Sequence, residues 1–215
     1  MKRKSERNIG RNSDRTRSAI VEFFRLWGAG YLTPRRMFGG IGAAKGPGIG
    51  LAATLVRGLL IGLLSYLPAY LAGKLPTPPG PFTFIPQESY FLFLSAFSPV
   101  YFLITWLAYN ALTYLILRLL KYEISFDMLL NLSGMVALVV GSFIILQDWI
   151  WILVGLKSVI ILGISHLVID VWAVTLIVVG MKKLMKIPVW LGIVLNIVVW
   201  IAAVPVAMFL MRAPM

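Results

Sequence analysis

The chain has 215 residues, of which 60% are hydrophobic and 13% are charged. Soluble domains are roughly 45–50% apolar and about 25% charged, so this composition excludes a soluble globular protein and, beyond the polar N-terminus, a disordered one. The formal net charge is +12, but the basic residues cluster before residue 46 and at the ends of apolar runs, which is typical of membrane topology signals and not of nucleic-acid binding.

Residues 1–17 are basic and polar without hydrophobic periodicity, and we expect a flexible tail. The pattern changes over residues 18–30, where Phe23, Phe24 and Trp27 can share one broad face of a helix. This pattern predicts an amphipathic helix in the headgroup layer, held there by its aromatic residues and by anionic lipid headgroups as partners.

A second short helix is predicted after Thr33-Pro34, because threonine suits an N-cap and proline the first helical position. Arg35 and Arg36 near its start are expected to be further membrane-interface anchors. The glycine-rich run 39–50 then predicts a flexible joint, which completes an interfacial region over residues 18–50. Lys45 in this run is not followed by Ser or Thr and no strand precedes it, so the run is not a phosphate loop.

A transmembrane domain of five helices is predicted over residues 51–212, since a bilayer core needs about 20 apolar residues per helix. Its spans are expected over residues 51–73, 91–117, 128–147, 159–181 and 188–210.

The first span carries a motif for helix contact and a proline. Gly58 and Gly62 have the GxxxG spacing that permits close approach of two helices, and Pro68 predicts a bend. Arg57 is expected near the cytoplasmic end of this span, where its side chain can snorkel to the headgroups.

The connections set the orientation. The proline-rich stretch 74–90 predicts an irregular loop, and residues 148–158, with Trp149 and Trp151 as belt residues, are assigned to the interface. Lysine and arginine favour alternate loops, which places the N-terminus in the cytoplasm and the C-terminus outside. Four spans with one interfacial hairpin is the alternative topology.

Three stretches resemble the Yip family, membrane proteins named for interacting with Ypt/Rab GTPases, and in particular its prokaryotic-type members. They are YLTPRRMF (31–38), RLLKYEISFDMLLNLSGM (118–135) and VWAVTLIVVGMKKLMKIP (171–188). The resemblance covers about residues 20–210 and implies a five-helix bundle with a cytosolic N-terminal region. Eukaryotic relatives are linked to membrane trafficking and organelle shape. Their Asp-Leu-Tyr-Gly-Pro element is absent here, and the third helix lacks the proline expected in its outer half, so GTPase binding is not carried over.

Polar residues at membrane depth are the candidate functional residues. His166 and Asp170 are four apart and share a helix face. We expect Asp170 to be neutral and hydrogen-bonded within the bundle, because no Lys or Arg is predicted at its depth. One polar network is possible among His166, Asp170 and three amides, and the alternative is a set of separate helix–helix hydrogen bonds. The amides are Asn110, Asn131 and Asn196.

Catalytic, cofactor and metal sites are not predicted. The chain has no cysteine, and two possible ligands at His166 and Asp170 fall short of the three or four that metal sites need. Ser165 adjoins His166 but points about 100° away on a helix, and no GxSxG elbow surrounds Ser133.

The sequence therefore predicts an all-α polytopic protein of a prokaryotic cell membrane with a cytoplasmic amphipathic segment. The first functional hypothesis is a non-enzymatic scaffold or adaptor that meets a protein partner on its cytoplasmic face. The alternative is a small transporter or channel component whose polar network lines a path. A transporter needs these residues around a hydrated cavity, whereas a scaffold needs only dry, paired contacts.

Overall fold

The computed structural model describes residues 18–76, 79–80, 82, 84–154 and 159–210, and only the backbone of residues 151–152, 159, 162 and 203–210. The predicted tail lies outside this range. The described chain is helical and contains no strand. After a helical stretch over residues 18–32, its helices are α2 (Pro34–Ala43), α3 (Gly48–Ile61), α4 (Leu67–Leu71), α5 (Tyr90–Leu119), α6 (Phe126–Leu153), α7 (Val159–Met185) and α8 (Val189–Leu210).

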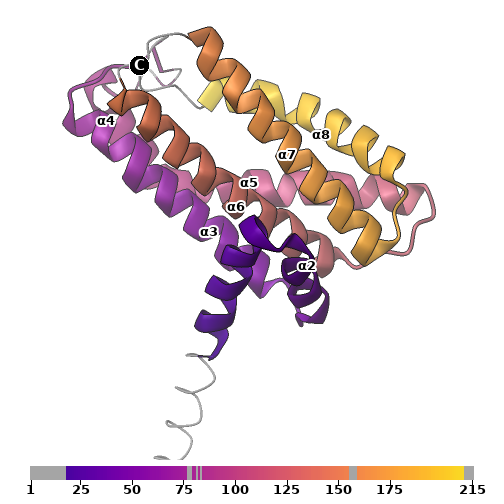
Figure 1. The fold of residues 1–215 in the computed structure, drawn as a ribbon. Helices are drawn as coiled ribbons and strands as arrows, with labels where there is room; N and C mark the ends of the chain where they lie inside the picture. Colours follow the sequence, from indigo (N-terminus) through magenta and orange to yellow (C-terminus); the bar gives the residue numbers. More distant parts are fainter. Residues whose placement is uncertain (1–17, 77–78, 81, 83, 155–158, 211–215) are drawn as a thin grey trace, which may run out of the picture.

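The long helices form one bundle with α6 at its centre (Figure 1). In α6, 72% of the most apolar window is buried, against 28–33% in the other long helices, so lipid or another molecule must cover the rest of their apolar surface. Helix α3 packs on α6 and α5, α7 packs on another side of α6, and α8 packs on α7.

Four helical segments are long and apolar enough to cross a bilayer: Gly48–Leu71, Gln87–Leu119, Phe126–Ile150 and Gly163–Met185. A shorter apolar stretch, Val189–Ala202, forms the described part of α8. The expected class, an all-helical protein that crosses a membrane several times, agrees with this arrangement.

Two predicted non-helical stretches are helical in part. The joint expected over residues 39–50 is reduced to 44–47, because α2 continues to Ala43 and α3 begins at Gly48. Glycine lowers helix propensity, but Gly40 and Gly50 lie against Leu26 and Leu130 where a Cβ would clash, so packing outweighs propensity. Likewise α6 continues through residues 148–153 of the predicted interfacial stretch, and residues 155–158 lie outside the described chain.

A π-helical turn, Gly62–Tyr66, interrupts the α-helix immediately before α4, which carries Pro68. Proline has no N–H to offer the carbonyl four residues earlier, which belongs to Leu64. The indole Nε1 of Trp149 on α6 donates a hydrogen bond of 2.8 Å to that carbonyl. The partner helix thus satisfies the group that the proline leaves free.

The GxxxG pair meets α5 at its own proline. A Cβ on Gly58 would lie 2.5 Å from Cα of Pro99, and a Cβ on Gly62 would lie 2.4 Å from the carbonyl oxygen of Ser95. Ser95 is the residue four before Pro99, so its carbonyl also lacks the usual helical donor. The predicted close contact therefore occurs between α5, around its internal Pro99, and the segment formed by α3 and the π-helical turn.

Candidate functional site

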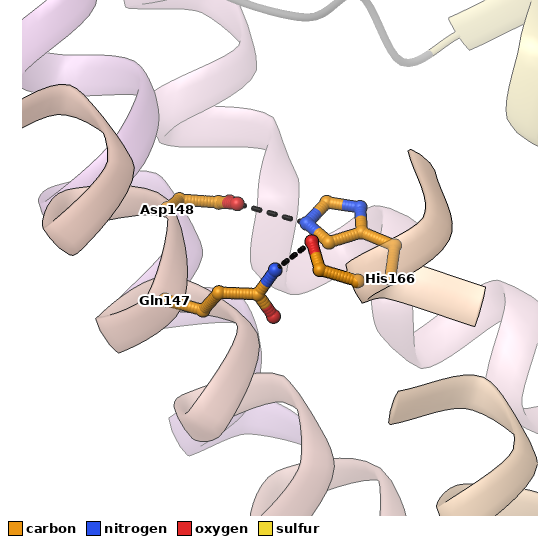
Figure 2. Close-up of polar contacts among 4 residues, drawn as sticks. Gln147, Asp148 and His166 are labelled. Carbon is orange, nitrogen blue, oxygen red and sulfur yellow. Dashed lines mark hydrogen bonds and ion pairs between the residues drawn. The ribbon is translucent and has the colours of Figure 1, made fainter. Parts of the chain in front are cut away.

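Two polar pairs join α6 and α7 in the half of the bundle away from α2. His166 Nε2 lies 2.9 Å from Asp148 Oδ1, and Gln147 Nε2 donates a hydrogen bond to Ser165 Oγ. Figure 2 shows the side chains of Gln147 and Asp148 reaching from consecutive positions of α6 toward α7. Both side chains of the His166–Asp148 pair are 35% exposed, so the pair lies at the edge of the bundle and not in its core.

The hydrogen bond that we expected Asp170 to form within the bundle is not found among the described residues. The imidazole turns to Asp148 on the neighbouring helix, and Asp170 is exposed on α7 without a hydrogen bond to any described residue. The i, i+4 spacing places His166 and Asp170 on one face, but that face also meets α6, where Asp148 offers a carboxylate within direct reach.

Arg57 lies deeper than expected. It is about 14 Å along α3 from Gly48, at 1.5 Å per residue, and it packs inside the bundle instead of reaching the helix end. Its guanidinium carbon lies 4.4 Å from the centre of the Phe102 ring, and a Cβ on Gly141 would meet its Nε at 2.8 Å. The Nε atom is buried and has no hydrogen-bond acceptor in the described chain.

Arg57 and Asp170 lie at similar heights in the bundle. On α7, Asp170 lies between Trp172, whose ring contacts Phe143, and His166, which contacts Asp148. It is therefore level with residues 143–148 of α6, which lie about 3–10 Å further along the helix axis than Gly141, the residue on which the guanidinium packs. The expectation that no arginine shares the depth of Asp170 is wrong, and the two charges attract one another.

These four residues form what we call the ionisable cluster: Arg57, Asp148, His166 and Asp170. It comes from α3, α6 and α7 and contains one fixed cation, two carboxylates and one histidine, so protonation of His166 would balance its formal charge. Charged side chains at membrane depth are costly and generally mark functional positions. No group of three or more possible metal ligands occurs among the described residues.

The three asparagines lie at separate helix contacts. Asn110 accepts a hydrogen bond of 2.9 Å from Ser133 Oγ, between α5 and α6. Asn196 accepts one of 2.7 Å from the Tyr109 hydroxyl, between α8 and α5.

Asn131 on α6 holds the start of α3. It accepts a hydrogen bond from the Gly50 N–H and donates one to the Gly46 carbonyl, each 2.8 Å long. None of the three amides is bonded to the ionisable cluster in the described chain. The five candidate residues therefore lie at four sites: the ionisable cluster, which holds His166 and Asp170, and one separate helix contact for each asparagine.

The predicted interface residues have several different surroundings. Phe24 is 57% exposed, whereas Phe23 and Trp27 pack partly against the core. Trp27 Nε1 donates hydrogen bonds of 3.2 Å to Ser142 Oγ and to the Tyr31 hydroxyl.

Ser142 lies about 24 Å along α6 from Phe126, so the helix over residues 18–32 contacts the middle of α6 and not its first turn. Arg35 and Arg36 are exposed, and Trp149 bonds to α3 as described. The side chain of Trp151 lies outside the described residues.

The sequence pointed to His166 and Asp170 but missed Arg57, Asp148 and Gln147. Asp148 falls in the stretch predicted to be interfacial because the apolar run 149–180 is too long for one span and too short for two. Arg57 is predicted at the interface because a long side chain near a helix end can snorkel. The sequence signal that could have found them is the presence of a charged residue in each of three apolar helices, because such charges can attract one another across the bundle.

Comparison with family models, with curated proteins and with solved structures found no match to this chain.

Proposed function

We propose that the chain is a five-span membrane protein with its N-terminus in the cytoplasm. The fifth span is α8, whose described part is apolar. Support for the orientation comes from one end of the bundle, where α5 ends, α6 begins, and α7 and α8 meet. Exposed basic residues gather in these two connections, as the positive-inside rule expects of a cytoplasmic end. They are Arg118, Lys121, Lys182, Lys183 and Lys186.

The proposed role is that of a non-enzymatic scaffold or adaptor, with the basic end as the surface for a protein partner. The observation that carries it is that the buried amides are bonded to other groups of the protein, which a scaffold needs and a hydrated path does not. Lys183 Nζ also donates a hydrogen bond of 3.2 Å to the Arg35 carbonyl, which attaches α2 to this end of α7. The resemblance to the Yip family favours the same reading.

The topology is tested with single cysteines in sealed vesicles of the full chain, which has no native cysteine. Replacements at Ser13 and Ser125 should react only after the membrane is opened in right-side-out vesicles. Replacements at Thr77 and Pro214 should react without opening. Protection of Pro214→Cys together with Ser125→Cys would reduce the number of spans to four.

The adaptor role is tested by photo-crosslinking in cells. A crosslinking residue at Lys121 or Lys182 should capture one defined protein, and the same residue at Glu88 in the opposite connection should not. Equal capture at both ends, or none at the basic end, would contradict the role.

A second candidate function is proton-coupled transport, and the ionisable cluster is the observation that favours it. In this case Asp170→Asn and His166→Gln would abolish a pH-driven flux in liposomes while the protein still folds. Flux that is absent from the unmodified chain across a range of proton gradients would remove this candidate.

A further inference from the structure

A groove with two arginines runs between the helix of residues 18–32 and α2. It encloses about 620 Å³, and Arg25 lines it from the first helix and Arg36 from the second. Thr33, at the turn between them, also lines it. The groove is open because Gly28 and Gly39, which face it, have no heavy atom within 4 Å of where a Cβ would stand.

The two guanidinium groups are available to a ligand. Arg36 is exposed and has no ion pair or hydrogen bond from its side chain to a described residue. Arg25 pairs with Glu22 at 3.0 Å, but its side chain is 74% exposed, and an exposed pair of this kind contributes little. Arginine forms paired hydrogen bonds with phosphate oxygens, and two arginines on opposite walls can hold one phosphate between them.

An apolar side chain borders the same groove. Leu32 lines it and is 85% exposed. Phe24 does not line it, because its ring stacks on Trp27 with the ring centres 5.9 Å apart. The opposite side of the helix is fixed to the bundle through Trp27 and Tyr31, both bonded to Ser142. The exposed side therefore presents cationic groups next to a large apolar group, which matches a molecule with an anionic head and hydrocarbon chains.

We propose that this groove binds the phosphate of an anionic glycerophospholipid, with its acyl chains along Leu32. The proposal rests on the proposed cytoplasmic orientation of the N-terminus, and it assigns a discrete site where general attraction of residues 18–30 to a charged surface had been expected. Arg36 and Arg35 separate the two ideas. They are consecutive and equally charged, but only Arg36 lines the groove.

The test uses the full chain purified in a neutral detergent and titrated with short-chain phosphatidylglycerol or phosphatidylcholine, with binding followed by native mass spectrometry. Only one or a few molecules of phosphatidylglycerol should bind to each protein molecule, and phosphatidylcholine should bind much more weakly. Arg36→Gln and Arg25→Gln should each weaken phosphatidylglycerol binding about five- to tenfold, since each removes about 1 kcal/mol or slightly more. Arg35→Gln, the matched control, should weaken it less than about twofold.

Equal losses with Arg35→Gln and Arg36→Gln would overturn the site, because only net charge would then matter. Equal binding of the two lipids would also overturn it, as would binding of glycerophosphoglycerol, which lacks chains, as tightly as the lipid. Failure of the topology is distinguishable: inverted cysteine labelling would refute the cytoplasmic placement and leave the difference between Arg35 and Arg36 unchanged.

Discussion

The two sides of α6 are built by different means. Toward α3 the backbones touch: a Cβ on Gly134 would lie 2.5 Å from the Gly50 carbonyl oxygen, and one on Gly50 would lie 2.3 Å from that of Leu130. Toward α7, in the half of the bundle away from α2, the contact is made by polar side chains: His166 with Asp148 and Gln147 with Ser165. A contact between backbones admits one spacing, whereas contacts between side-chain ends tolerate small displacements of the helices.

This difference indicates which parts of the bundle are fixed. Helices in lipid have no hydrophobic driving force toward each other, so close backbone packing is a main source of their association. We infer that α3, α5 and α6 form a rigid unit and that α7, with the exposed Asp170, is attached to it more loosely. The predictions below test this contrast.

The largest effect is expected from Gly134→Ala. The added methyl group would meet the backbone of Gly50, which cannot move aside as a side chain can, and overpacking of this kind costs about 1–3 kcal/mol. The measurement is thermal unfolding in detergent. Gly163→Ala on α7 is the matched control, because its Cβ meets no heavy atom within 4 Å. It should leave stability unchanged or raise it by up to about 1 kcal/mol through helix propensity. Similar losses for both variants would refute the contrast.

Asn131→Ala is expected to have the next largest effect, about 1–2 kcal/mol. It leaves the Gly50 N–H and the Gly46 carbonyl without partners at the start of α3. Asn131→Asp keeps the acceptor for Gly50 and loses the donor to Gly46, so its denaturation midpoint should fall between those of the unmodified chain and the alanine variant. An aspartate variant less stable than the alanine variant would contradict this account.

A smaller effect is expected between α6 and α7. In a double-mutant cycle of Asp148→Asn and His166→Gln, we expect a coupling energy of about 0.6–1.7 kcal/mol, as for hydrogen bonds between membrane helices. Thermal stability of the four proteins gives this energy. A coupling near zero would mean that the pair forms no effective bond between the helices, and one above about 3 kcal/mol would make this side as rigid as the other.

The smallest effect is expected at Asp170. Because its side chain is exposed and forms no hydrogen bond with a described residue, Asp170→Asn should change stability by less than about 0.5 kcal/mol. Asp170→Leu should be neutral or stabilising, since removal of a carboxylate lowers the cost of insertion. A loss of more than about 1 kcal/mol with leucine would indicate a partner in the bundle for Asp170.

The sequence predicted the helices better than their contacts. Hydropathy placed the starts and ends of most spans within a few residues, and Thr33-Pro34 starts α2 as expected. Hydropathy could not show that glycines such as Gly50 are helical. Gly50 is held in the helix by its contacts with Leu130 and Asn131, which lie some 80 residues away in the sequence.

The same limit applies to the candidate site. Spacing along one helix suggested His166 with Asp170, but it carries no information about the helix opposite, where Asp148 lies. Arg57 was placed near the surface because a long side chain can reach it. Gly141 and Phe102, which enclose it in the bundle, belong to two other helices.

At the hydrogen bond from Trp149 to the Leu64 carbonyl, the local preference of the chain agrees with the packing of the bundle, because Pro68 leaves free the carbonyl that Trp149 needs. Replacement of Pro68 by a good helix former would give that carbonyl an N–H within α3 and favour a straight helix. A straight helix would withdraw the acceptor from Trp149 and move Gly62 away from Ser95. The irregular turn before α4 is therefore favoured by Pro68 itself, and α5 and α6 pack against a shape that this segment already prefers on its own.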